Sequence, residues 1–313
     1  MANRIDGNRT EEATPRGFFI KTTREVDEIW NWLSFLSSPR NVENLLLKRI
    51  VTGRFGINHS LLLEKKKRAK DSGRQNSLFS IIGEADVKAH SRRIPRYITQ
   101  AKQLFQAAKH VSEIASPILF YYGMQSLAKA LILSMYRYDS PHPKAFFTHG
   151  LGIDRTTYNR VTTKPLGFFS RFHDCYSTVP EMYLDEMTFS LEELLSANPE
   201  LIVEYGLVYE KDPNIRERLA EIHLKADVDL GIYEIPPIKG VRLDIMDSMF
   251  MSMFILSNKA RYQPEEWIEE IETGKEGFIL RSFLTKTERR FPNIILNRIW
   301  GDTFVFGPPA RWG

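Results

Sequence analysis

The apolar segment at residues 118–136 constrains the fold more than any other feature of the sequence. It is long enough to span a lipid bilayer, but it carries Gln125 and Lys129 near its middle. A charge at the centre of a bilayer costs several kcal/mol, and a helix that is apolar nearly all round is normally enclosed by neighbouring elements. We therefore expect a helix that other helices surround, in a protein with no membrane partner.

Apolar residues recur at helical spacing along much of the remaining chain. A second apolar stretch, residues 245–257, is too short to span a bilayer and contains Asp247, so it also predicts a buried helix. Ser190 with Glu193 fits a capping box. The sequence predicts helices near residues 23–36, 42–50, 94–115, 118–136, 190–195, 213–225, 244–260 and 278–291, and another that starts at Pro264; residues 294–300 are expected to pack against another element.

Strand signals are weak and short. Residues 228–238 alternate between apolar and polar side chains, which predicts a strand or hairpin edge. Residues 150–163 are expected to be a turn-rich connection, and residues 166–179 fit either a strand or a helix. The predicted fold is mainly α: a helical bundle with minor β elements. We expect a flexible N-terminal tail at residues 1–17 and a single large domain at residues 18–313.

The net charge and the cysteine content indicate which partners and which cellular compartment suit the protein. The net charge of +4 permits contact with nucleic acid without requiring it. Cys175 is the only cysteine, so no intrachain disulfide forms, as suits a reducing cytosol. Residues 1–14 are polar and lack the apolar core of a secretory signal. We expect a cytoplasmic protein.

Two basic clusters are candidates for contact with a nucleic-acid backbone. The first cluster precedes the predicted helix at 94–115, and the second lies in a polar stretch. A solvated face is the alternative interpretation of both. The candidate nucleic-acid-binding residues are Arg92, Arg93, Arg96, Lys65, Lys66, Lys67 and Arg68.

Three segments resemble a known family. They are FYYGMQSLAKAL at 120–131, LSNKARYQPEEW at 256–267 and FPNIILN at 291–297. In this order they are similar to the YaaC-like family of bacterial proteins. The resemblance covers the chain from about residue 25, and it implies no settled activity.

A second, local resemblance covers residues 94–152. The two tyrosines that open the helix, its Ala-Lys-Ala-Leu end and the loop Thr148-His149-Gly150-Leu151 are similar to the HEPN superfamily. This resemblance implies a HEPN-like helical core and often a homodimer. Many HEPN proteins are metal-independent ribonucleases in toxin and phage-defence systems, whereas others only bind nucleotides or partner proteins.

The HEPN resemblance also implies a catalytic pattern, an arginine followed four to six residues later by a histidine. Such a pair would supply a base for the ribose 2′-hydroxyl and a cation for the developing phosphorane charge. Arg137 with His142 fits this spacing, although Ser140-Pro141 places the pair in a loop; Arg218 with His223 is a weaker candidate on a predicted helix. The same spacing arises by chance, so an incidental origin stays open.

His149, Gln125 and Lys129 are further candidates. His149 fits a base or phosphate contact, or a structural role in its loop. Gln125 and Lys129 lie on an otherwise apolar helix, so they must be paired or line a buried polar pocket. The chain carries no P-loop and no G-x-G-x-x-G, G-x-S-x-G or H-E-x-x-H motif. We expect no metal and no cofactor.

Two functional hypotheses follow. In the first, the protein is a cytosolic nucleic-acid-associated effector, with metal-independent RNA cleavage in stress or phage defence as its candidate activity. In the second, it is a non-catalytic protein that binds a nucleotide or a partner protein. The sequence leaves open whether the chain is an enzyme.

Overall fold

The computed structural model describes residues 17–52, 83–135, 148–165, 167–176, 186–209, 226–227, 232–233, 238–241 and 243–307. Within these residues the protein is mainly helical. The helices are α1 (Glu25–Phe35), α2 (Pro39–Thr52), α4 (Glu84–His110), α5 (Ser116–Met135), α6 (Phe168–Asp174), α7 (Leu191–Ser196), the 3-10 helix η3 (Pro199–Leu201), α8 (Ile202–Val208), α10 (Ile245–Tyr262), α11 (Pro264–Glu272) and α12 (Gly277–Trp300). The strands are β1 (Gly17–Lys21), β2 (Leu151–Ile153), β3 (Arg160–Thr163), β4 (Thr188–Ser190), β5 (Ala226–Asp227), β6 (Ile232–Tyr233) and β7 (Thr303–Gly307).

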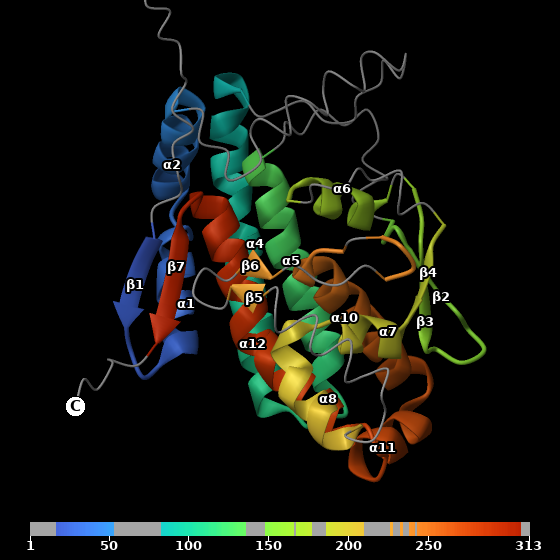
Figure 1. Cartoon of the computed structure of the whole chain (residues 1–313). Coiled ribbons are helices and arrows are strands. Elements are labelled where there is room, and N and C mark those ends of the chain that lie inside the picture. Colours follow the sequence, from blue (N-terminus) through green and yellow to red (C-terminus); the bar gives the residue numbers. More distant parts are fainter. Residues whose placement is uncertain are drawn as a thin grey trace, which may run out of the picture.

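Helix α5 forms the centre of the bundle. It packs against α4, α6, α10 and α12, and Tyr121, Met124 and Leu127 have no exposed surface. Figure 1 shows α5 between the β1–β7 pair on one side and the β2–β3–β4 sheet on the other. Among the described residues α5 alone is long and apolar enough to cross a bilayer, and 72% of its most apolar stretch is buried inside the protein. The expectation that neighbouring helices enclose this segment is confirmed.

Helices α4 and α5 approach closely at Gly123. A Cβ atom at this position would lie 2.6 Å from a ring carbon of Phe105 on α4. Trp30 and Phe120 both pack on Phe105, with ring centroids 5.3 Å from the Phe105 centroid in each case. The glycine therefore lets α4 seat its aromatic ring directly on the backbone of α5.

Helix α4 begins at Glu84, so the prediction of a start near residue 94 was wrong. Val87 and His90 are buried and extend the apolar stripe toward the N-terminus. Pro95 lies inside the helix. As a consequence, Arg92 and Arg93 project from the body of a long helix and do not precede it.

The N-terminal and C-terminal parts of the described chain meet in a small parallel sheet. Strand β1 pairs with β7 from Gly17 opposite Thr303 to Lys21 opposite Gly307. Neither strand was predicted, because strands of five residues that pair across the whole chain leave little local pattern. The helix predicted at residues 278–291 is longer than expected: α12 continues to Trp300, with Pro292 inside it.

The second sheet corrects another prediction. Residues expected to form a turn-rich connection instead contain β2 and β3, which pair antiparallel and continue to β4. These strands have three or four residues, too few to show alternation. Strand β6 lies inside the segment 228–238 that was predicted as a strand or hairpin edge, and it pairs antiparallel with β5 just before that segment. The ambiguous stretch at 166–179 contains helix α6.

The predicted capping box and the predicted burial of the helix that carries Asp247 are both confirmed, whereas the partners of Asp247 were not predicted. Ser190 caps α7: the Glu193 amide donates to Ser190 Oγ at 3.1 Å, and the Ser190 amide donates to Glu193 Oε2 at 2.8 Å. Asp247, on buried helix α10, is fully enclosed; His173 Nδ1 lies 3.0 Å from both of its oxygens, and the Tyr176 hydroxyl donates to it at 2.6 Å. This buried carboxylate joins α6 to α10 through charge-assisted hydrogen bonds.

Candidate functional site

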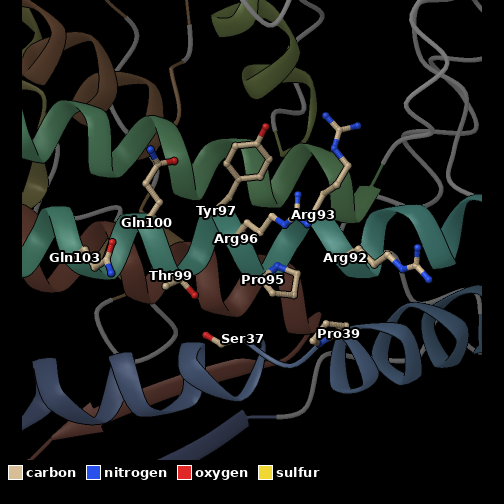
Figure 2. Close-up of a pocket in the computed structure, with 10 residues that line it drawn as sticks. All are labelled: Ser37, Pro39, Arg92, Arg93, Pro95, Arg96, Tyr97, Thr99, Gln100 and Gln103. Carbon is tan, nitrogen blue, oxygen red and sulfur yellow. The ribbon is translucent and has the colours of Figure 1, made fainter.

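A basic cleft lies along α4 where it faces the junction of α1 and α2. Its volume is about 920 Å³, and Figure 2 shows most of its lining residues along one stretch of α4, with Ser37 and Pro39 on the facing α1–α2 junction. The residues that line it are Ser37, Pro39, Arg92, Arg93, Pro95, Arg96, Tyr97, Thr99, Gln100 and Gln103. Arg92, Arg93 and Arg96 were predicted as one basic cluster. All three line this cleft.

Two of the three arginines of this cleft have no compensating negative charge among the described residues. Arg92 and Arg96 are exposed, and in the described part of the chain neither side chain has a hydrogen-bond or ion-pair partner. The other polar lining groups are hydroxyls and amides, which are neutral. The cleft therefore presents positive charge beside groups that donate and accept hydrogen bonds.

Tyr97 and Gln100 connect the cleft to α5. The Tyr97 ring centroid lies 5.8 Å from Lys129 Nζ, a cation–π distance. Gln100 Oε1 accepts a hydrogen bond of 3.1 Å from Ser126 Oγ. The half-buried Lys129 thus lies directly behind the tyrosine that lines the cleft.

His149 is held in place by its backbone. The Phe169 amide donates to the His149 carbonyl at 3.0 Å, which ties the loop to the start of α6. Gly150 has a left-handed φ of 68°, and a Cβ on Gly167 would lie only 2.1 Å from the Gly150 Cα. This crossing of two glycines brings the His149 loop against α6 and over α5.

The His149 ring meets α5 through two side chains. The Tyr121 hydroxyl lies 2.8 Å from His149 Nδ1, and Gln125 Nε2 lies 3.5 Å from the same nitrogen. Lys129 donates to Gln125 Oε1 at 3.4 Å. Gln125 and Lys129, predicted as a buried polar pocket, are half-buried and belong to this short chain of hydrogen bonds.

The electrostatics of this cluster favour a neutral imidazole. Burial, followed by the charges of Arg261 and Lys129, lowers the pKa of His149 below its ordinary value. Burial also lowers the pKa of Lys129. Desolvation disfavours the charged form of both groups, and nearby cations add to this effect at the histidine.

Arg261 supplies a second cation beside Lys129. Its guanidinium lies 5.9 Å from the Tyr122 ring and donates to the Tyr122 hydroxyl at 3.2 Å. It was not predicted as a site residue. Arg261 lies inside the segment 256–267 that resembles the YaaC-like family, which is a signal for it. The sequence alone does not indicate that this arginine lies beside α5.

The family comparison agrees with the segments noted above. The profile of the YaaC-like protein family matches residues 61–235 and 235–299. The chain belongs to the YaaC-like family. No curated protein and no solved structure matches this YaaC-like chain. The HEPN-like core over residues 94–152 stays a prediction.

Several predicted site residues fall on positions that the structure does not describe. Both Arg/His pairs and the second basic cluster are among them, so their placement is not part of the site described above. These residues are Arg137, His142, Arg218, His223, Lys65, Lys66, Lys67 and Arg68. Among the described residues, no group of three or more His, Cys, Asp or Glu side chains is arranged to hold a metal ion.

Proposed function

We propose that this YaaC-like protein binds single-stranded nucleic acid, with RNA as the ligand, through the basic cleft on α4. The observation that carries the proposal is the presence of three arginines in one cleft, two of them exposed and without carboxylate partners in the described chain. Uncompensated guanidinium groups favour phosphate, which they contact in bidentate geometry. Release of counterions from the phosphates adds to the binding free energy.

The remaining lining residues fit a single strand better than a duplex. Tyr97 offers an aromatic ring, and Gln100 and Gln103 offer amides that can donate to and accept from unpaired bases. Proteins that bind single strands combine a positive groove with stacking side chains. The proposal places the protein in the cytoplasm, where such RNA is available.

We propose binding in place of cleavage at the described residues. A general base needs a free ring nitrogen that accepts a proton from the attacking hydroxyl. Nδ1 of His149 already faces the Tyr121 hydroxyl and the Gln125 amide; with these two donors on Nδ1 the ring proton occupies Nε2, so neither ring nitrogen is free to accept a proton. This geometry supports the non-catalytic hypothesis over the ribonuclease hypothesis for His149.

The test is a fluorescence-anisotropy titration of an RNA of about 15 nucleotides, within the range of single-strand binding sites. Wild type should bind, and the double variant Arg92→Gln/Arg96→Gln should bind at least about tenfold more weakly, because it loses two charged phosphate contacts. Glutamine preserves helix propensity and removes the positive charge.

Arg155→Gln is the matched control. Arg155 is exposed, and its side chain has no partner in the described chain, so this variant should bind as wild type does. Equal binding by the double variant, or no binding by wild type, would remove the proposal. A gel of the same samples in EDTA reports cleavage, and the proposal expects intact RNA.

A further inference from the structure

We propose that Lys129, His149 and Arg261 form a second binding site, separate from the basic cleft, that takes a phosphoryl group. The three side chains come from α5, the loop before β2 and the last turn of α10. The inference does not rest on the nucleic-acid proposal, because its donors are not the arginines of the cleft, although Lys129 also contacts Tyr97 of the cleft. Its ligand is a phosphate ester, either a diester within a nucleic acid or a monoester such as a nucleotide.

Among the described residues, no negative charge lies against the positive groups of this site. The charged groups that act on His149 in the described chain are Arg261 and Lys129, both cations. Lys129 contacts Gln125 Oε1 and the rings of Tyr97 and Phe168, none of which carries a negative charge.

Arg261 is likewise oriented by neutral groups. Its Nε donates to the Ser257 carbonyl at 3.0 Å, and its Nη2 donates to Asn258 Oδ1 at 3.3 Å. The rings of Tyr122 and Tyr262 lie 5.9 Å and 5.2 Å from the guanidinium carbon. These contacts hold the guanidinium in place and leave its positive charge uncompensated. A bound anion would supply the missing negative charge.

The hydrogen bonds of His149 set its tautomer. Lys129 donates to Gln125 Oε1, so the Gln125 amide nitrogen points toward His149 Nδ1 as a donor. Burial raises the pKa of Tyr121 far above its ordinary range, so its hydroxyl keeps its hydrogen. Two donors therefore face Nδ1, and the ring proton of the neutral imidazole belongs on Nε2.

This tautomer gives the site its third donor. The Nε2–H group is not used by any hydrogen bond of the described residues, and the His149 residue is exposed. An Nε2–H group donates to an oxyanion without needing to be protonated further. Lys129, Arg261 and His149 together offer the ammonium, guanidinium and imidazole donors that phosphate oxygens accept.

The experiment uses inorganic phosphate as the probe and the full chain with isotope-labelled histidine. Phosphate, but not chloride at equal ionic strength, should shift the His149 ring resonances in a saturable titration. Arg261→Gln and Lys129→Gln should each weaken the apparent affinity about tenfold or more, the scale of one charge-assisted contact. Arg24→Gln, a change at an exposed arginine before α1, should leave the affinity unchanged.

The nitrogen shifts of the His149 ring test the tautomer, and the proposal expects the proton on Nε2. The site is overturned if phosphate leaves the His149 resonances unmoved, if both variants bind phosphate like wild type, or if Nδ1 carries the proton. Adenosine monophosphate and a dinucleoside phosphodiester, used as competitors, separate monoester from diester; displacement by either supports the site. Arg92→Gln/Arg96→Gln should retain this phosphate binding, which distinguishes failure here from failure of the cleft.

Discussion

The Tyr121 hydroxyl and His149 Nδ1 lie 2.8 Å apart, at the point where the central helix meets the loop before β2. Tyr121 has no exposed surface, whereas the His149 residue is exposed. The pair therefore links the core of the bundle to the surface. A substitution at Tyr121 in the core should therefore change the pKa of His149, which is in contact with solvent.

Tyr121→Phe should raise the pKa of His149. When Nδ1 of His149 is protonated, it can no longer accept a hydrogen bond from the buried Tyr121 hydroxyl, and this loss disfavours the charged imidazole. Phenylalanine has no hydroxyl, so the loss does not arise in the variant. The free energy of unfolding should fall by about 0.5–1.5 kcal/mol, the usual net value of one hydrogen bond. A histidine-detected NMR titration measures the pKa, and a pKa that stays the same or falls would contradict the assigned donor.

Gly123→Ala should destabilise the protein by about 1–3 kcal/mol, the cost of overpacking a core. Alanine is worth about 1 kcal/mol more than glycine in a helix interior, but its Cβ would lie 2.6 Å from the Phe105 ring. That ring has little room to move, since Trp30 and Phe120 pack on it. Urea unfolding measures the change; a variant that is more stable than wild type would show that α4 and α5 are not in such close contact.

Asp247→Ala should lower the free energy of unfolding by about 3–5 kcal/mol, because it breaks a buried charged network. The change leaves His173, Tyr176 and the Asp244 amide without their acceptor. Ser252→Ala on the same helix is the matched control. Ser252 Oγ is buried without a hydrogen-bond partner in the described chain, so its loss should change stability by less than about 1 kcal/mol. Equal effects of the two substitutions would contradict the role of Asp247.

Acidification from pH 7.5 to about 6, near the ordinary pKa of histidine, should destabilise the protein. Burial lowers the pKa of His90, which is 2% exposed and donates from Nδ1 to the Leu133 carbonyl at 2.7 Å. The unfolded chain therefore binds more protons than the folded chain in this range, so lower pH favours unfolding.

Urea titrations at several pH values check this linkage. His90→Asn keeps a donor for Leu133 but cannot titrate, so the loss of stability with falling pH should be smaller than in wild type. A wild-type midpoint that rises on acidification would contradict the direction of the linkage.

The helical fold was predictable where the sequence carries its own period. The residues around Tyr121 and Met124 identify a buried helix because apolar side chains cover every face. The pairing of β1 with β7 was not predictable, since Phe18 and Phe304 meet across nearly the whole chain. The start of α4 was missed because its first turns carry charges among few apolar residues.

The candidate site was predictable in composition and not in geometry. Arg92, Arg93 and Arg96 are adjacent in sequence, and a helix necessarily brings them near one another. Arg261 lies far from His149 along the chain. Its charge affects the pKa of that histidine because α10 packs on α5. Sequence separation of this kind leaves no local pattern to detect.

The salt dependence of RNA binding tests the central claim most directly. Each phosphate contact on a single strand contributes about 0.7 to the slope of log K against log salt. Loss of Arg92 and Arg96 should therefore make the slope shallower by about 1.4 in Arg92→Gln/Arg96→Gln, with Arg155→Gln unchanged. A double variant with the slope of wild type would contradict phosphate contact by the cleft.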